Sequence, residues 1–250
     1  MDERVMGTEI SKGALATCPE NRLVVLQPSY LPWIGYFAQM ERADKFIFLD
    51  DVQYTRRDWR NRNKIRTNEG WAWLTVPVQQ KNHYTQLLKE TRIDNSTNWN
   101  KKHCSAIKFN YSKAPFFEDY YPYFDSIYQK QWDFLVDLCY EITGYLKAVL
   151  NISTQTFRSS DFLVEGTKSN RILNLCEKMR ATHYLTGNLA HDYLSGVNFS
   201  EKGVELEYQE YDHPNYSQQY LGFVPNMSLI DLLFNAGDKS LDVLMNWDKN

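Results

Sequence analysis

The 250-residue sequence contains few cysteines, and none of the four lies close to another in the chain. No cysteine and histidine spacing typical of a zinc site is present, so we expect no metal centre. Cys139 and Cys176 fall on apolar faces of predicted helices. Reduced thiols in a cytoplasmic protein are therefore the interpretation we favour, for Cys18 and Cys104 as well.

Long hydrophobic runs are absent too. No apolar stretch approaches the roughly 20 residues that a helix needs to span a bilayer. Residues 1–21 begin with acidic side chains and lack a secretory hydrophobic region, so we expect a flexible leader there. The net charge of −3 at pH 7 argues against general binding of nucleic acid, which usually requires a basic domain.

Several signatures of well-known enzyme classes are missing. We find no nucleophile elbow with a serine–histidine–aspartate set, no Walker A loop and no glycine-rich dinucleotide loop. Aromatic residues, by contrast, make up 15% of the chain, with 17 Tyr and 7 Trp. Most of them are expected in the core, but rings that carry a polar group also suit ligand stacking, as in sugar sites.

The hydrophobic pattern predicts a single α/β domain over residues 22–250. Short apolar runs predict strands, and apolar residues spaced three and four apart predict helices. We expect strands at 22–26, 45–49, 154–158, 182–186 and 204–209, and helices at 32–43, 97–109, 115–128, 132–150, 167–180 and 228–235. Because β-α-β units normally give parallel strands, we predict a parallel, Rossmann-like sheet with a helical insertion at about 97–150.

A β-hairpin is predicted between the second strand and the helical insertion. Its arms, residues 59–66 and 71–78, flank a four-residue turn at 67–70. The first arm is strongly polar, so we expect the hairpin to line a site or to cover an edge of the sheet.

Polar residues follow two of the predicted strands. Gln27 ends the first strand, shortly before Tyr30, and Asn188 follows the strand at 182–186. Parallel strands place their carboxyl ends at one edge of the sheet, where open α/β sheets bind ligands. We therefore expect Gln27 and Asn188 to face one cleft, with Tyr30 and His191 as candidate catalytic residues. The alternatives are a proline turn with Tyr30 packed inward, and a structural role for His191.

Asp51 ends the second strand, directly before a basic segment. Adjacent carboxylates at a strand end point to opposite faces, so only one of Asp50 and Asp51 should face the site. Asp51 could act as a general base, bind a substrate amine or reach a Mg²⁺ ion. A solvated strand end with a capping role is the alternative.

Six cationic residues lie between Arg56 and Arg66. Alternation over residues 59–66 places four of them on one strand face, namely Arg60, Arg62, Lys64 and Arg66. Guanidinium groups bind phosphate oxygens through paired hydrogen bonds, so this row suits the diphosphate of a nucleotide or nucleotide sugar. A solvated face and RNA binding are the alternatives.

From about residue 23 to the C-terminus the chain resembles the WbqC-like family of bacteria. The resemblance rests on the motifs QPSYLPWIGYF, FLDDVQYTRRDWRNRNKIR, WLTVPV, YLTGNLAHDYL and SLIDLLFNAG. Members occur in gene clusters for O-antigen, the lipopolysaccharide side chain, and related surface polysaccharides, and some are proposed glycine transferases acting on amino sugars. The resemblance implies a site at the matched positions Gln27, Tyr30, Asp51, Gln53, Arg57, Trp59, Asn61 and Lys64.

A weaker resemblance concerns the segment after the first strand. The layout of Trp33, Gly35 and Tyr36 is similar to that of nucleotidylyltransferases and pantothenate synthetases, where a His-x-Gly-His signature follows the first strand. Trp33 and Tyr36 replace both histidines here. This resemblance therefore implies a nucleotidylyltransferase-like core without ATP activation through that motif.

These features lead us to expect an acyl or aminoacyl transferase, such as a glycyl transferase, acting on the amino group of a nucleotide-linked amino sugar. The basic residues would hold the diphosphate, Asp51 or His191 would take the amine proton, and N–H groups near Gln27 or Asn188 would stabilise the oxyanion. The donor stays open between a free amino acid with ATP and Mg²⁺, a thioester and a charged tRNA, and the oligomeric state stays open as well. The alternatives are another nucleotide-sugar enzyme of the same pathway and a noncatalytic nucleotide-sugar- or RNA-binding module.

Overall fold

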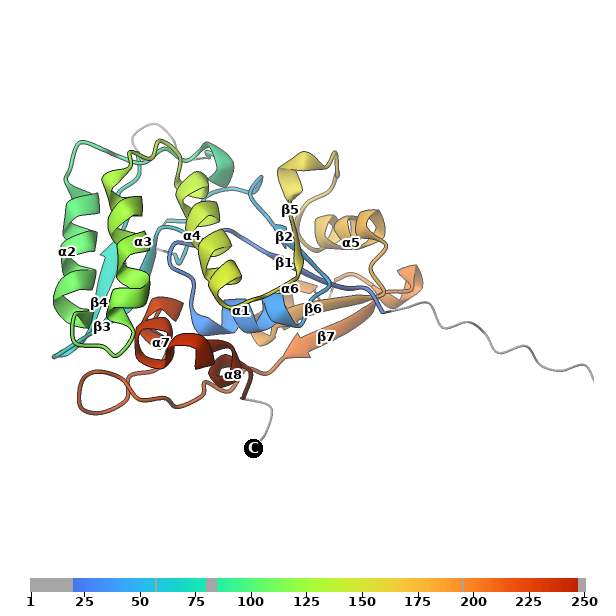
Figure 1. Cartoon of the computed structure of the whole chain (residues 1–250). Helices are drawn as coiled ribbons and strands as arrows, with labels where there is room; N and C mark the ends of the chain where they lie inside the picture. Colours follow the sequence, from blue (N-terminus) through green and yellow to red (C-terminus); the bar gives the residue numbers. More distant parts are fainter. Residues whose placement is uncertain (1–19, 57, 80–84, 195, 247–250) are drawn as a thin grey trace, which may run out of the picture.

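Figure 1 shows the fold as a computed structural model that describes residues 20–56, 58–79, 85–194 and 196–246. Of the predicted leader, residues 1–19 lie outside these ranges. Asn21 already belongs to the folded part, because its side-chain amide donates to the carbonyl oxygens of Met179 and Arg180. None of the helices in the described ranges combines the length and the apolar character needed to cross a membrane.

A five-stranded parallel sheet forms the centre of the fold, in the order β5-β2-β1-β6-β7. The strands are β1 (Arg22–Leu26), β2 (Lys45–Phe48), β5 (Gln155–Arg158), β6 (His183–Gly187) and β7 (Glu205–Gln209). Each of them lies where the hydrophobic pattern predicts a strand. The parallel, Rossmann-like fold class is therefore confirmed.

The two faces of the sheet belong to two separate cores, because successive side chains of a strand point to opposite sides. Val24 and Phe46 pack in the larger core, whereas Leu23 and Ile47 pack in the smaller one. Strands buried on both faces read as continuous apolar runs, as RLVVL and KFIF do.

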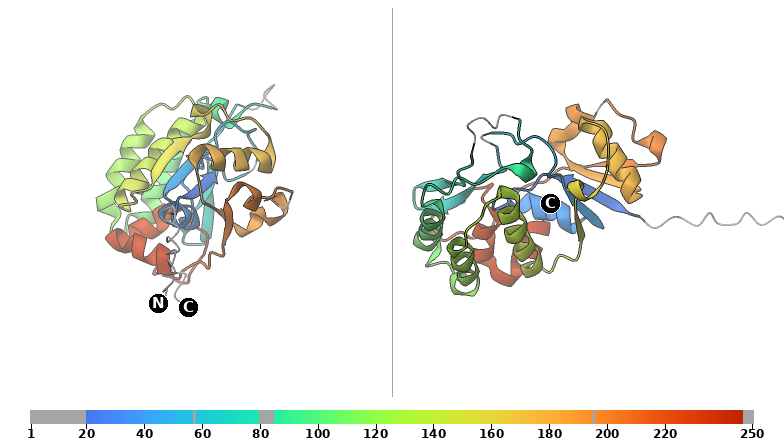
Figure 2. Two further views of the ribbon diagram at one scale, coloured as in Figure 1. Left: turned by 90° about the vertical axis from the view of Figure 1, so that its right-hand side faces the viewer. Right: turned by 90° about the horizontal axis from the view of Figure 1, so that it is seen from above.

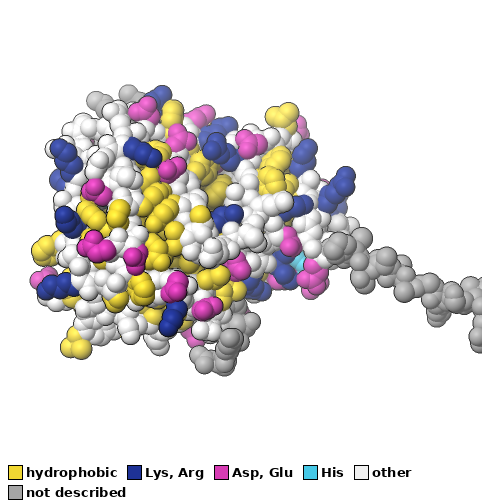
Figure 3. Space-filling view, viewed as in Figure 1, with side chains coloured by type: hydrophobic (Ala, Val, Ile, Leu, Met, Phe, Trp, Pro, Cys, Tyr) yellow, Lys and Arg dark blue, Asp and Glu magenta, His cyan; other side chains and the backbone are white. Residues whose placement is uncertain are grey.

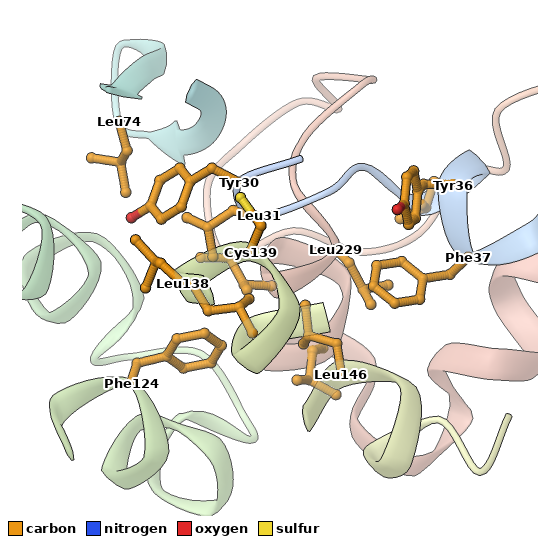
Figure 4. Close-up of a cluster of buried hydrophobic side chains, with 14 of the residues drawn as sticks. Tyr30, Leu31, Tyr36, Phe37, Leu74, Phe124, Leu138, Cys139, Leu146 and Leu229 are labelled. Atoms are coloured by element: carbon orange, nitrogen blue, oxygen red, sulfur yellow. The ribbon is translucent and has the colours of Figure 1, made fainter. Parts of the chain in front are cut away.

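Helices cover both faces of the sheet. The larger core joins the sheet to α1 (Ile34–Glu41), α4 (Leu135–Val149), α7 (Leu229–Ala236) and α8 (Ser240–Met245). Figure 4 shows part of it, with Phe37, Leu146 and Leu229 close together. The smaller core joins the sheet to α5 (Lys168–Met179) and α6 (His191–Leu194). Helix α8 has no counterpart among the predicted elements.

The predicted helical insertion consists of α2 (Trp99–Tyr111), α3 (Phe117–Gln129) and α4. The helices α2 and α3 lie beside the hairpin strands at one end of the molecule, and β7 and α5 lie toward the other end (Figures 1 and 2). The apolar faces of α2 and α3 pack against each other. The apolar face of α4 packs in the same core as the sheet.

The hairpin consists of β3 (Arg62–Thr67) and β4 (Gly70–Thr75), and its turn is shorter than predicted. Thr67 pairs directly with Gly70, which leaves a two-residue turn at Asn68 and Glu69. Gly70 has a φ of 124°, which residues with a side chain rarely adopt. The predicted four-residue turn is therefore wrong, because the glycine lets the strands pair up to the turn.

Tyr30 lies in the core between the sheet and the helical layer, not in a cleft. Its hydroxyl bonds to His103 Nδ1 at 2.8 Å and to the hydroxyl of Tyr128. Its ring lies near Leu74 and Leu138, with the hydroxyl directed away from Tyr36 (Figure 4). The expected catalytic role of Tyr30 is thus not supported, and the inward-packed alternative describes the residue.

We predict that His103 makes the fold sensitive to acid. Burial lowers the pKa of His103 from 6.5 to about 4, so between these values the unfolded chain binds a proton that the folded protein does not. Stability is present above pH 6.5 and is lost as the pH falls toward 4. From pH 7 to pH 5 this single group should cost about 2 kcal/mol of unfolding free energy.

Urea unfolding at both pH values checks this prediction. The variant His103→Gln removes the titrating ring, so its loss of stability between pH 7 and pH 5 should be smaller than that of the wild type by this amount. Equal losses in both proteins would assign the acid sensitivity to other groups.

Candidate functional site

A cleft of about 610 Å³ opens at the carboxyl ends of β1 and β6. The chain leaves β1 toward β2 on one side, while β6 and β7 lie on the other, so the order of strands reverses between β1 and β6. Open α/β sheets bind ligands at such a switch point. The cleft is lined by Leu26, Ser29, Pro32, Trp33, Tyr36, Gln39, Trp59, Arg60, Asn63, Lys64, Thr186, Gly187, Ala190, Tyr193 and Asn226.

One wall of the cleft is a single face of α1 and the residue before it. Trp33, Tyr36 and Gln39 follow each other at intervals of three, which places them on one side of a helix. Gly35 makes this arrangement possible, because a Cβ atom there would lie 2.4 Å from the indole ring of Trp33. Any larger residue would displace the ring from the cleft.

This wall carries two buried oxygens that make no hydrogen bond. The hydroxyl of Tyr36 and Oε1 of Gln39 are both shielded from solvent, and their residues are 4% and 7% exposed. Burial raises the pKa of Tyr36 well above 10, so the phenol keeps its proton. A buried polar group without a partner costs about 1–3 kcal/mol, which a ligand with matching groups would offset.

The hairpin arm forms the second wall, and Arg60 fixes it to the loop after β1. Its guanidinium donates to the carbonyl oxygen of Gln27 at 3.3 Å and to Oγ of Ser29 at 3.0 Å, and it pairs with Asp58 at 3.4 Å. Asn63 adds a bond of 2.6 Å from Nδ2 to the carbonyl oxygen of Leu31. These contacts hold the loop against the hairpin and so define the shape of the cleft.

Lys64 projects from the same wall among indole rings. Its Nζ lies 4.7 Å from the ring centroid of Trp71, 5.6 Å from that of Trp73 and 5.8 Å from that of Trp59. Such cation–π contacts hold an ammonium group without neutralising its charge.

The charged side chains that line the cleft are both cationic, and Asp58 pairs with one of them, Arg60. Among the described lining residues of the cleft Arg60 and Lys64 are the charged ones, and no carboxylate or imidazole is present. Burial also raises the pKa of Tyr193, so its phenol stays uncharged at neutral pH. Within the described ranges no group of three histidine, cysteine, aspartate or glutamate side chains could hold a metal ion.

The structure brings together a part of the predicted site. Trp59, Arg60 and Lys64 line the cleft. Gln27 and Asn188 lie at the carboxyl ends of the parallel neighbours β1 and β6, directly beside the lining residues Leu26 and Gly187. The two strand-end loops therefore lie at the same edge of the sheet as expected, but neither Gln27 nor Asn188 is itself among the lining residues of the cleft.

Asp51 lies outside the cleft and has two structural partners. Its carboxylate pairs with the Arg171 guanidinium on α5 and accepts from Oγ of Ser159 at 2.6 Å. Asp50 accepts from the same Ser159 Oγ at 3.0 Å, from Ser160 N at 2.9 Å and from Tyr140 OH at 2.9 Å, so the two carboxylates share a partner instead of pointing to opposite faces. Both carboxylates thus fasten the end of β2, so a catalytic role for Asp51 has no support in this geometry.

The other predicted residues do not line the cleft. Gln53 is exposed and forms a β-bridge with Leu87, and Asn61 is buried, with Nδ2 2.7 Å from the carbonyl oxygen of Val76. His191 is exposed and stacks on Tyr208 with ring centroids 3.5 Å apart. Arg57 lies outside the described residues.

The predicted row of four cations is shorter than expected. Arg66 is buried and donates to the carbonyl oxygens of Gly70 at 2.7 Å and Leu221 at 2.9 Å. It therefore belongs to the core rather than to a ligand site. On the opposite face of the strand Asn63 and Ile65 are buried, whereas Trp59, which the alternation also places there, is exposed and lines the cleft with Lys64.

Twelve lining residues are missing from the site that the sequence predicts, and six of these have aromatic or amide side chains: Trp33, Tyr36, Gln39, Asn63, Tyr193 and Asn226. The spacing of three between Trp33, Tyr36 and Gln39 is a signal that could have found half of these six. Asn226 comes from a distant segment that hydrogen bonds place beside the hairpin, since Ser228 N donates to Lys64 O at 2.9 Å.

A second hollow of about 480 Å³ lies along α3 and α4, lined by residues such as Tyr123, Glu141 and Arg158. Hydrophobic side chains gather over these helices, with cationic and acidic side chains mixed around them (Figure 3). None of the residues that the sequence predicts for a site lines this hollow. We therefore assign the candidate site to the cleft at the strand ends.

Comparison with known proteins gives one family. A family model described as the WbqC-like protein family matches residues 27–243. The chain is 39% identical over 225 residues to the uncharacterized protein Rv1507c of Mycobacterium tuberculosis, which covers 89% of this chain and 97% of that protein. No solved structure matches the chain significantly. The matched segment contains every residue that lines the cleft except Leu26.

We predict that Asp51→Asn destabilises the fold and leaves ligand binding intact. The substitution removes the charge that Arg171 faces in a partly buried site, so the unfolding free energy should fall by about 2 kcal/mol. Urea unfolding measures the loss.

Glu141→Gln provides a matched control, because Glu141 pairs with Lys130 at an exposed position. It should change stability by less than about 0.5 kcal/mol. If Asp51→Asn has wild-type stability but has lost turnover, Asp51 is a catalytic residue and not a structural one.

Proposed function

Since the chain belongs to the WbqC-like protein family, we propose that it is a transferase that moves an acyl or aminoacyl group, such as glycyl, onto the amine of a nucleotide-linked amino sugar. The product would serve the synthesis of O-antigen or another surface polysaccharide. The family resemblance supplies the class of substrate, and the cleft supplies the support from geometry.

One observation carries the proposal: the cleft at the switch point joins a cationic wall to an aromatic one. Arg60 and Lys64 suit the oxygens of a diphosphate, and Trp33 and Trp59 offer ring faces for a sugar or base. The amide oxygen of Gln39, which has no hydrogen-bond partner, adds an acceptor for a hydroxyl group. A cleft of about 610 Å³ is in the range typical of small-molecule sites.

The electrostatics of the cleft favour an uncharged amine. An ammonium group would lose water and meet Arg60 and Lys64 without a carboxylate among the described lining residues, and both effects favour its neutral form. Oε1 of Gln39 and the hydroxyl oxygen of Tyr36, which have no hydrogen-bond partner, can each accept a hydrogen bond from an N–H group of such an amine and leave its lone pair free. A neutral amine is the form that can attack an acyl carbon.

The donor in this proposal is an activated carboxyl group, carried as a thioester, an aminoacyl ester or an acyl phosphate. The amine nitrogen forms a bond to the acyl carbon, and the bond from that carbon to the leaving group breaks with its electron pair. The nitrogen then loses one proton. His191 is the proposed acceptor, because it directly follows the lining residue Ala190 and is exposed, although its ring stacks on Tyr208; the polar atoms of Asp51 and Tyr30 are instead engaged by Arg171 and His103.

A second candidate function is noncatalytic binding of a nucleotide sugar. The absence of a carboxylate or an imidazole among the described lining residues favours it. Incubation with the sugar nucleotide and each donor class, followed by mass spectrometry, separates the two functions. Binding without any acylated product would favour the binding module.

We predict that Lys64→Met abolishes binding of nucleotide sugars. The variant keeps an unbranched apolar side chain among the indole rings but removes the charge that would meet the diphosphate. A thermal-shift screen with UDP-, dTDP- and GDP-sugars should show a rise in melting temperature for the wild type and none for the variant.

Lys102→Gln, at an exposed position on α2, serves as the control and should keep the wild-type shift. The melting temperatures of the two unliganded variants should lie close to that of the wild type. A normal ligand shift in Lys64→Met would refute the assignment of the diphosphate to this wall.

We predict that His191→Gln lowers turnover by about 100- to 10,000-fold, the range typical of a general base, while the nucleotide sugar still binds. The measurement is the rate of product formation at saturating substrate, with binding checked by thermal shift. Turnover at the wild-type rate would show that the proton leaves by another route.

A further inference from the structure

Three tryptophans form an aromatic surface on the hairpin and on the segment before it. Trp59 and Trp73 have ring centroids 5.2 Å apart, and Trp71 and Trp73 are 5.6 Å apart. We call Trp59, Trp71 and Trp73, with the two cations above them, the tryptophan face. The cations are Lys64 and Arg62, whose guanidinium carbon lies 4.3 Å from the ring centroid of Trp73.

Much of this aromatic surface is in contact with solvent. Trp59 is 42% exposed and Trp71 is 47% exposed. Large exposed rings rarely gather on a protein surface without a ligand or partner. The rings also differ from core aromatics in their neighbours, because a cation lies over each of them.

The tryptophan face continues the cleft. Trp59 and Lys64 line the cleft, Trp73 contacts Trp59, and Trp71 lies beyond Trp73. A ligand that extends out of the cleft along the hairpin therefore meets the charge of Lys64 together with indole rings that lie tilted and edge-to-face to one another.

We propose that the tryptophan face is the nucleobase subsite, so that the bound nucleotide sugar has its base on the hairpin and its sugar in the cleft. This orientation rests on the proposed function. The diphosphate then lies at Lys64 and Arg60, between the two ends. Every base has a π face, so stacking on indole rings is tolerant of base identity and adds binding energy beside the phosphate contacts. The sugar reaches the uncharged wall of Tyr36 and Gln39.

The direction of the ligand follows from the distribution of charge. Both lining cations lie on the hairpin side of the cleft, whereas the α1 wall carries Trp33, Tyr36 and Gln39. A reversed ligand would place its base against Gln39 and its amine beside Arg62 and Lys64, exposed to solvent. That placement would leave the two buried oxygens of the α1 wall without a sugar to bind.

The test compares a ligand that has a base with one that has none. Isothermal titration measures the affinities of UDP, dTDP, GDP and inorganic pyrophosphate for the wild type and for Trp71→Ala. Loss of one stacking ring should weaken the best-binding nucleoside diphosphate about 5- to 150-fold. Pyrophosphate, which contacts only the cations, should lose less than about twofold.

Two further variants make the result specific. Trp71→Phe keeps a ring for stacking and should recover most of the affinity that Trp71→Ala loses. Phe109→Ala removes an exposed ring from α2, outside the tryptophan face, and should bind all ligands as the wild type does. Equal melting temperatures of the unliganded variants show that Trp71→Ala is folded.

The outcomes test the proposed orientation of the ligand separately from the proposed transferase activity. Base-dependent loss in Trp71→Ala supports the orientation even if no acyl transfer is found. Unchanged affinity for the nucleoside diphosphates, with transfer intact, overturns the orientation alone. Equal losses for nucleoside diphosphate and pyrophosphate also overturn it. Tight, salt-sensitive binding of single-stranded RNA that depends on Trp71, without binding of nucleoside diphosphates, would overturn it in favour of RNA recognition.

Discussion

The registered pairs of β1 with β6 lie at the start of the strands, where Arg22 pairs with His183 and Leu23 with Tyr184. In contrast, β6 pairs with β7 along its whole length, from His183 to Gly187. The sheet therefore stays closed on the β7 side and opens between the carboxyl ends of β1 and β6. This opening lies at the point where the strand order reverses, and it is the constraint on which the cleft, its walls and its proposed ligand all depend.

The loop after β1 has to be held open for such a cleft to persist, and the hairpin holds it. Arg60 and Asn63 donate to carbonyl oxygens on that loop, and Tyr30 N donates back to Arg60 O at 3.1 Å. The loop includes Leu31 at a φ of 47°, a left-handed conformation that costs roughly 1–2 kcal/mol for a residue with a side chain. Tyr30 anchors the same loop from the other side, in the bonds to His103 and Tyr128. Tyr30, which the sequence offers as a catalytic residue, thus helps to shape the cleft.

Most of the fold could be predicted from the sequence, because strands such as RLVVL and helices such as α4 have clear periodicity. Their parallel order also predicted that the loops after β1 and β6 would meet. The residues of the site were harder to predict, because a charged residue near a strand end can form an ion pair or hydrogen bonds inside the protein instead of facing a ligand. Asp51 pairs with Arg171 on α5, 120 positions away in the chain. Arg66 donates a hydrogen bond to the carbonyl oxygen of Leu221. Long-range partners of this kind leave no local pattern, whereas the helical spacing of Trp33, Tyr36 and Gln39 does.

The most direct test of the central claim is a crystal structure of the protein with a nucleotide sugar that raises its melting temperature. We predict that the diphosphate lies within hydrogen-bonding distance of Arg60 and Lys64, in the cleft at the ends of β1 and β6. Density for the ligand in the hollow along α3 and α4, with the cleft at the strand ends holding only solvent, would contradict this prediction.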